Sequence, residues 1–127
     1  MSPARPAATV STHVLDTSAG RPAAGIAVEV SVRPGADAPW TAHAASATDA
    51  DGRCRDLPAL PEDTAHVRLR FGVEPYLVRT RRTDPADGGG AAAFFPEVAV
   101  VAAVTTGEHH HLPLLLSPFG YSVYRGS

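Results

Sequence analysis

Apolar and polar residues alternate along much of this chain, with the period of two that is typical of a β-strand with one buried face. Within residues 26–32, the apolar positions are Ile26, Val28, Val30 and Val32. Within residues 66–71, they are Val67, Leu69 and Phe71. The alternation is weaker but still favours a strand at residues 10–15 and 40–48.

Three more strands are predicted in the C-terminal half. Residues 94–104 are nearly all apolar, which is typical of a strand covered on both faces by a core or by a partner subunit. Residues 109–116 and 121–124 flank a good hairpin connection at 117–120. Residues 77–82 are expected to form one or two helical turns, and 83–92, rich in Gly and Pro, to be the least ordered stretch.

Many short strands separated by turns predict an all-β sandwich or barrel. The 12 prolines and 11 glycines are spread along the chain, which disfavours long helices. At 127 residues the chain fits one domain, and we expect a flexible N-terminal extension at 1–8 followed by a single β-sandwich at 9–127. So small a domain buries its apolar strands poorly on its own, so we also expect a homo-oligomer.

Composition excludes several function classes. The net charge of −2 and the pI near 6.3 imply no basic face, so we expect no nucleic-acid or membrane partner. The chain has no lysine, which excludes Schiff-base chemistry and a Walker-type phosphate loop. Its one cysteine, Cys54, can form neither an internal disulfide nor a Cys-based zinc site. No apolar run has the length of a signal peptide or a membrane span, so a soluble, cytoplasmic protein is expected.

Histidines are the main candidates for chemistry. Three of the six are consecutive, and strand alternation sends His109 and His111 to one face and His110 to the other. Three interpretations are open: a solvated or hydrogen-bonded run, a metal site, and acid–base catalysis. Imidazole suits the last because it titrates near pH 6.5.

Other candidates carry weaker signals. His13 shares its predicted strand face with Ser11 and Leu15, and Arg53 follows a turn glycine. No Gly-x-Ser-x-Gly elbow is present to support a Ser-His-Asp triad. The last predicted strand runs almost to the final residue, Ser127, with an aromatic residue and an arginine beside the terminal carboxylate.

Three blocks of sequence resemble the transthyretin-like family, and within it the 5-hydroxyisourate hydrolases. The first block is STHVLDT at 11–17 with GRPA at 20–23, and the second is TDADGR at 48–53. The third begins with FFPEV at 94–98, continues through HLPLLLSPFGYS at 111–122 and ends in YRGS at 124–127. The terminal YRGS is the mark of the hydrolase branch. His110 departs from the pattern, because the family usually has an aromatic residue there.

The resemblance implies a sandwich of two four-stranded sheets with one short helix. It also implies a homotetramer, a dimer of dimers with active sites at the dimer–dimer interface. The implied reaction is the opening of the 5-hydroxyisourate ring by water, a step of urate breakdown that yields 2-oxo-4-hydroxy-4-carboxy-5-ureidoimidazoline. No metal or organic cofactor is implied.

Functional residues carry over position by position, and they are His13, Arg53, His111 and the terminal Tyr124, Arg125, Gly126 and Ser127. Either His13 or His111 is the base that deprotonates water, and the sequence does not choose between them. Arg53 would hold the oxygens of the substrate.

In the tail, Tyr124 and Arg125 would contact substrate, although a structural role suits Arg125 better. Ser127 would orient a histidine. Two alternatives remain: a carrier that binds a small ligand in the channel between subunits, and a His-rich metal protein.

Overall fold

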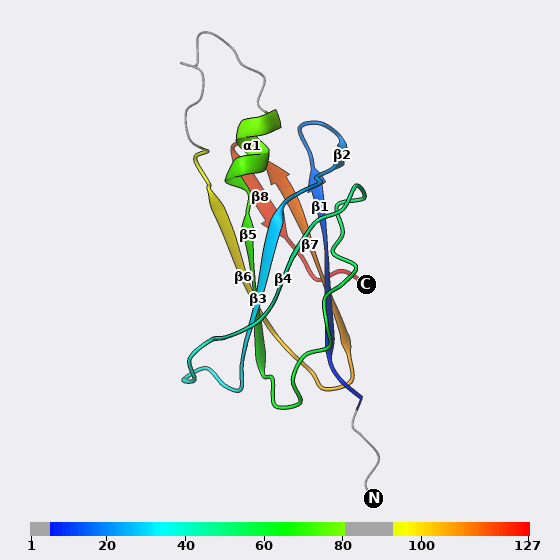
Figure 1. The fold of residues 1–127 in the computed structure, drawn as a ribbon, viewed down its shortest axis with the longest axis vertical. Coiled ribbons are helices and arrows are strands. Elements are labelled where there is room, and N and C mark those ends of the chain that lie inside the picture. Colours follow the sequence, from blue (N-terminus) through cyan, green and yellow to red (C-terminus); the bar gives the residue numbers. More distant parts are fainter. Residues whose placement is uncertain (1–5, 81–92) are drawn as a thin grey trace, which may run out of the picture.

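Two four-stranded β-sheets pack face to face in the computed structural model, which describes residues 6–80 and 93–127 (Figure 1). The elements in chain order are β1 (Thr9–Asp16), β2 (Arg21–Pro22), β3 (Ala27–Arg33), β4 (Thr41–Ala47), β5 (His66–Gly72), α1 (Glu74–Thr80), β6 (Glu97–Ala103), β7 (His109–Ser117) and β8 (Gly120–Val123). One sheet has the order β2-β1-β7-β8, and the other has the order β4-β3-β5-β6. The predicted sandwich of two four-stranded sheets with one short helix is confirmed for the described residues.

The core lies between the inner faces of the two sheets. Val14 and Leu114 of the first sheet and Val28, Leu69 and Phe71 of the second are almost completely buried. Each such side chain stabilises the fold by about 1.5–3 kcal/mol relative to leaving it in water. The predicted alternation is therefore confirmed along β5 and along β3 as far as Val30, whereas Ser31 is buried at the point where the register with β4 shifts.

The apolar segment 94–104 is a shorter strand than the sequence predicts. Pro96 lacks a backbone N–H, and the ladder with β5 begins after it, at Glu97. The prediction that both faces of this segment are covered is wrong within this chain. Only Val98 is fully buried, while Val101 is 53% exposed and Phe94 81% exposed. Coverage by a partner subunit stays a prediction.

Helix α1 starts three residues earlier than expected, at Glu74 rather than Leu77. Pro75 lies in its first turn, where the missing N–H of proline costs no hydrogen bond. The prediction for residues 81 and 82 and for the loop 83–92 lies outside the described residues. Figure 1 shows α1 at one end of the sandwich, opposite the end where β1 begins. Within residues 6–80 and 93–127, no helix is long and apolar enough to cross a membrane.

Strand β1 pairs in parallel with β7, and this pairing sets the geometry of the candidate site. Ser11 lies opposite His111, and His13 lies opposite Pro113. The two strands come from opposite ends of the chain, so their alternating faces combine into one surface only in the folded protein. At the start of β1, Ala8 is buried and its carbonyl accepts a hydrogen bond from the amide of Leu60. The predicted domain boundary at 8/9 stays a prediction.

The chain end continues the pairing of β8 with β7. The predicted hairpin is confirmed, with Ser117 paired to Gly120 and the ladder running to Leu114 and Val123. The next paired residues are His111 and Gly126, three positions further along each strand in the same register. Pro113 lies in the interruption, where its missing N–H cannot donate to the tail. The tail thereby reaches the histidine run.

Candidate active site

His13 lies on the outer face of β1, where alternate side chains are partly exposed. Its backbone forms an isolated antiparallel bridge with Arg53. The adjacent amide of Val14 donates to the carbonyl of Gly52 at 2.8 Å. The turn at 49–52 thus lies directly against β1, and it brings the second sequence block beside the first.

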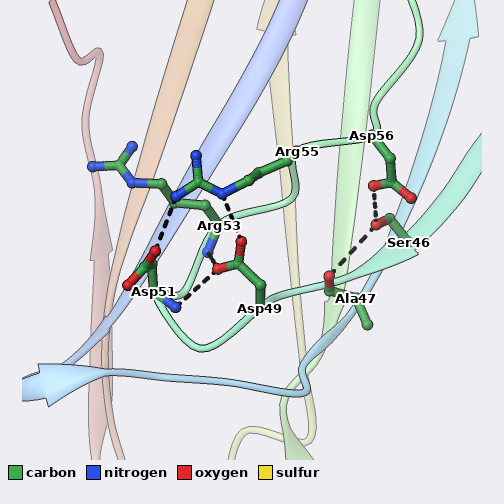
Figure 2. A network of polar contacts seen from close by, with 7 residues as sticks. All are labelled: Ser46, Ala47, Asp49, Asp51, Arg53, Arg55 and Asp56. Atoms are coloured by element: carbon green, nitrogen blue, oxygen red, sulfur yellow. Dashed lines mark hydrogen bonds and ion pairs between the residues drawn. The ribbon is translucent and has the colours of Figure 1, made fainter.

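A network of hydrogen bonds from Asp49 holds this turn (Figure 2). Its Oδ1 accepts from the backbone amides of Asp51 at 2.9 Å and Arg53 at 3.0 Å. Its Oδ2 accepts from Nε of Arg55 at 2.9 Å, and a second nitrogen of Arg55 donates to Asp51 at 2.9 Å. The amide of Arg53 and these neighbouring charges lower the pKa of Asp49. The carboxylate therefore fixes the backbone from which Arg53 extends.

The guanidinium of Arg53 is left available by this network. Figure 2 shows it pointing away from Asp49 and Asp51, whereas the guanidinium of Arg55 points toward both carboxylates. Among the described residues, no carboxylate forms an ion pair with Arg53. A partly buried guanidinium without a carboxylate partner is suited to binding the oxygens of a ligand.

The run of histidines divides between two faces as alternation predicts. His109 and His111 share the outer face, where the hydroxyl of Ser11 lies 2.7 Å from a nitrogen of each ring. His110 is buried on the other side, and its Nε2 accepts from the amide of Thr105 at 3.1 Å. Its Nδ1 must then donate to the carbonyl of Thr9, 3.0 Å away. His110 is thus a core histidine with both ring nitrogens hydrogen-bonded. The partly exposed His111 remains the candidate for catalysis.

His111 has the electrostatic setting of a base. Burial lowers its pKa below the ordinary value of 6.5, and the charge of Arg53 and the nearby rings of His109 and His13 lower it further, while the Ser11 backbone acts in the opposite direction. Its ring is accordingly mostly neutral at neutral pH. The same interactions place Arg53, His13 and His111 within electrostatic reach of one another.

The C-terminal tail lies against His111. The amide of Gly126 donates to the carbonyl of His111 at 2.8 Å. A Cβ added at Gly126 would overlap Cδ2 of the His111 ring, so only glycine lets the tail lie this close. Ser127 follows as an exposed residue. The tail therefore forms one wall beside the imidazole.

A groove of about 440 Å³ opens between β6 and the tail, and it is lined by His111, Tyr124 and Arg125 among others. Arg125 also forms an ion pair with Glu108 at 3.5 Å, consistent with a partly structural role. His13 and Arg53 are not part of the groove lining, so of the three site residues the groove includes His111 alone.

The other candidates have structural surroundings. Among the described residues, no three His, Cys, Asp or Glu side chains are grouped so that they could hold a metal ion. Cys54 is buried, and burial raises the pKa of its thiol. A raised pKa disfavours the thiolate that a nucleophile requires.

Comparison with known proteins decides the family. The sequence profile of the HIUase/Transthyretin family matches residues 10–126. The chain belongs to this family. It is 38% identical over 120 residues to a 5-hydroxyisourate hydrolase of Caulobacter vibrioides, covering 93% of this chain and 97% of the relative.

Solved structures of the HIUase/Transthyretin family share the fold. The Klebsiella pneumoniae 5-hydroxyisourate hydrolase aligns with a TM-score of 0.72 at 31% identity, covering 94% of this chain and 99% of that structure. Sea bream transthyretin in complex with thyroxine aligns with a TM-score of 0.72 at 28% identity, covering 92% of this chain and 93% of that structure. The predicted resemblance is confirmed.

Sequence reasoning missed the residues that support the site. The sequence identifies Ser11 only as a neighbour of His13 on a strand face, and its bonds to two histidines depend on the β1–β7 pairing. Asp49 was predicted only as part of a turn. An Asp at the first position of a turn ending in Gly was the available signal, since its carboxylate often binds backbone amides two residues on.

Proposed function

We propose that this protein hydrolyses 5-hydroxyisourate, opening its ring at an acyl C–N bond to give 2-oxo-4-hydroxy-4-carboxy-5-ureidoimidazoline. The observation that carries the proposal is the convergence of His13, Arg53 and His111 on the outer side of one sheet, beside the chain end. Relatives named 5-hydroxyisourate hydrolase match over most of this chain. The protein thus belongs to urate degradation.

In the proposed mechanism, His111 is the base. Its Nδ1 is held by the hydroxyl of Ser11, which leaves Nε2 to take a proton from water. The hydroxide formed attacks the ring carbonyl carbon, the C–N bond then breaks, and Nε2 of His111 donates its proton to the departing ring nitrogen. Arg53 binds the substrate oxygens and offsets the negative charge that develops on the carbonyl oxygen. His13, held beside Arg53, orients the substrate.

The tail and the oligomer complete the proposed site. Tyr124 binds substrate through its hydroxyl, Arg125 supports the tail and contacts substrate at the groove, and Ser127 orients a histidine. The exposed residues of β6, Val101 among them, favour burial by a second copy of the chain. We therefore propose a homotetramer, a dimer of dimers with the site at the dimer–dimer interface.

A cytoplasmic location belongs to the same proposal. The single cysteine is buried and free, as suits a compartment in which disulfides do not form.

The test is a direct assay. 5-Hydroxyisourate is generated from urate, and its decay is followed by ultraviolet absorbance with and without protein. The protein is expected to accelerate the decay, and His111→Gln, His13→Gln and Arg53→Gln are each expected to slow it by about tenfold to a hundredfold. Arg70→Gln, which changes an ion pair on the other sheet, is the control. No acceleration over the spontaneous reaction contradicts the proposal.

A carrier of a small ligand is the second candidate, because a thyroxine-bound transthyretin shares the fold. The polar side chains of His13, Arg53 and His111 on this side of the sheet favour hydrolysis instead, since a carrier of an apolar ligand needs apolar walls. Tight binding of thyroxine without any hydrolysis would reverse this order.

A further inference from the structure

Four side chains on the outer face of the β1–β7 pair form a continuous row of hydrogen bonds. Oγ1 of Thr9 lies 2.6 Å from Nδ1 of His109. Nε2 of His109 lies 2.7 Å from Oγ of Ser11, and this oxygen lies 2.7 Å from Nδ1 of His111. The row runs from the partly buried His111 to the exposed His109, so it joins the site to solvent. The parallel register creates it by placing Thr9 opposite His109 and Ser11 opposite His111.

The row couples the protons of the two rings. A serine hydroxyl carries one proton, so Ser11 donates to one imidazole and accepts from the other. In one arrangement His111 donates from Nδ1 to Ser11, Ser11 donates to His109, and His109 donates from Nδ1 to Thr9. In the other arrangement every donor and acceptor is reversed, and both rings carry their proton on Nε2. The two rings therefore hold the same tautomer in either arrangement.

We propose that Ser11, His109 and Thr9 form a proton relay that sets the tautomer of His111 and exchanges its proton with solvent during hydrolysis. The inference rests on the proposed function of His111 as base. Ser11, His109 and Thr9 are positioning residues, because they act on the reaction through His111. The relay gives His109 and Ser11 a role in the reaction that neither the family match nor strand alternation assigns.

The proton balance of the relay is simple. As water attacks, its O–H bond breaks and the proton binds Nε2 of His111. Nδ1 of His111 then releases its proton to Ser11, Ser11 passes its own to Nε2 of His109, and the Nδ1 proton of His109 passes through Thr9 to solvent. Both rings end neutral in the second arrangement. When the ring nitrogen of the substrate leaves, Nε2 of His111 donates its proton to that nitrogen. A proton from solvent then enters through Thr9, and transfers through His109 and Ser11 to Nδ1 of His111 restore the first arrangement. No positive charge has to remain on His111.

The charged surroundings of His111 favour this route. Arg53 approaches from the turn at 49–52, His13 lies on β1, and His109 lies on the same strand; each lowers the stability of a positive charge on the ring. On the tail side, the backbone amide of Gly126 donates to the backbone carbonyl of His111 and does not bond to its ring. On the inner side, His110 already has both ring nitrogens engaged with Thr105 and Thr9. Ser11 is thus the partner through which His111 can release a proton.

The kinetic test compares substitutions at Ser11. Ser11→Ala is expected to lower kcat by about tenfold with little change in KM, and to change the pH profile of kcat, because His111 must then carry the positive charge. Ser11→Thr keeps the hydroxyl on a residue that strands accept, and it is expected to restore both. Thr12→Val is the matched control, since it removes the neighbouring hydroxyl of β1 that bonds a backbone carbonyl on the buried face. A Ser11→Ala variant with the kcat and pH profile of the unaltered protein overturns the relay.

A second test does not depend on activity. Nitrogen NMR of the labelled protein identifies which ring nitrogen of His109 and of His111 carries the proton. The relay predicts the same tautomer on both rings, and Ser11→Ala should uncouple them. Opposite tautomers in the unaltered protein overturn the relay. If the protein proves not to hydrolyse 5-hydroxyisourate while the tautomers are coupled, the proposed function fails and the coupling of the two rings stands.

Discussion

Gly126 and His111 form the last backbone pair between the C-terminal tail and β7. The amide of Gly126 donates to the carbonyl of His111 at 2.8 Å, and the side of Gly126 where a Cβ would stand lies against the imidazole. The chain end is thereby attached to a proposed catalytic residue through a position that only glycine can occupy. This bridge continues the β7–β8 register beyond the end of β8 at Val123.

Gly126→Ala is expected to displace either the tail or the His111 ring, because its Cβ would overlap Cδ2 of that ring. We expect kcat/KM to fall by about tenfold to a hundredfold, with a small change in the free energy of unfolding, since the tail is peripheral. Steady-state kinetics and urea denaturation measure the two effects. Gly120→Ala is the control, because a Cβ there meets nothing within 4 Å. Equal activities of the two variants would contradict the expectation.

Gly52→Ala is expected to disturb both the fold and the placement of Arg53. Gly52 has a φ of +76°, and an added Cβ would overlap the carbonyl oxygen of Val14. Gly20 has a similar φ of +68°, but a Cβ there meets nothing within 4 Å. Gly20→Ala should therefore lower the free energy of unfolding by about 1–2 kcal/mol through backbone strain alone. Gly52→Ala should lower it by about 2–4 kcal/mol, and chemical denaturation of both variants compares them.

Asp49→Ala tests whether the turn network positions Arg53. The substitution removes the acceptor for the amides of Asp51 and Arg53, so kcat/KM is expected to fall by about tenfold. Arg55→Gln is the control, because it removes only the exposed ion pairs and leaves both backbone bonds in place. A loss of activity in Arg55→Gln as large as that in Asp49→Ala would show that the charge of Arg55 matters more than the backbone bonds.

The lowered pKa of His111 predicts the acidic limb of the pH profile. The base must be neutral, so kcat/KM should fall only below pH 6.5, the ordinary value for histidine. Folding favours the neutral ring, so the unfolded chain binds the proton first and the free energy of unfolding decreases as the pH falls through this range.

Proton NMR of His111 measures its pKa directly. Arg53→Gln should raise this pKa, but burial should still keep it below 6.5. Arg70→Gln should leave it unchanged. A His111 pKa at or above 6.5 in the unaltered protein would contradict the assignment.

Parts of the site could be predicted from sequence because they are local. Alternation correctly separates His109 and His111 from His110, since strand geometry depends on neighbouring residues alone. It also groups His13 with Ser11 and Leu15, which form the partly exposed face of β1. The length of β6 was predicted less well, because apolar composition does not reveal that Pro96 precedes the first paired residue.

By itself, the sequence determined the strand pattern, the turn glycines and, through the three matching blocks, the family. Only the tertiary structure decided that Ser11 lies between two imidazoles and that Gly126 lies against one of them. The physical reason is that β1 and β7 are about a hundred residues apart in the chain, as the separation of Ser11 and His111 shows. Which residues meet across such a pair depends on register, and register follows from burying both inner faces in one shared core.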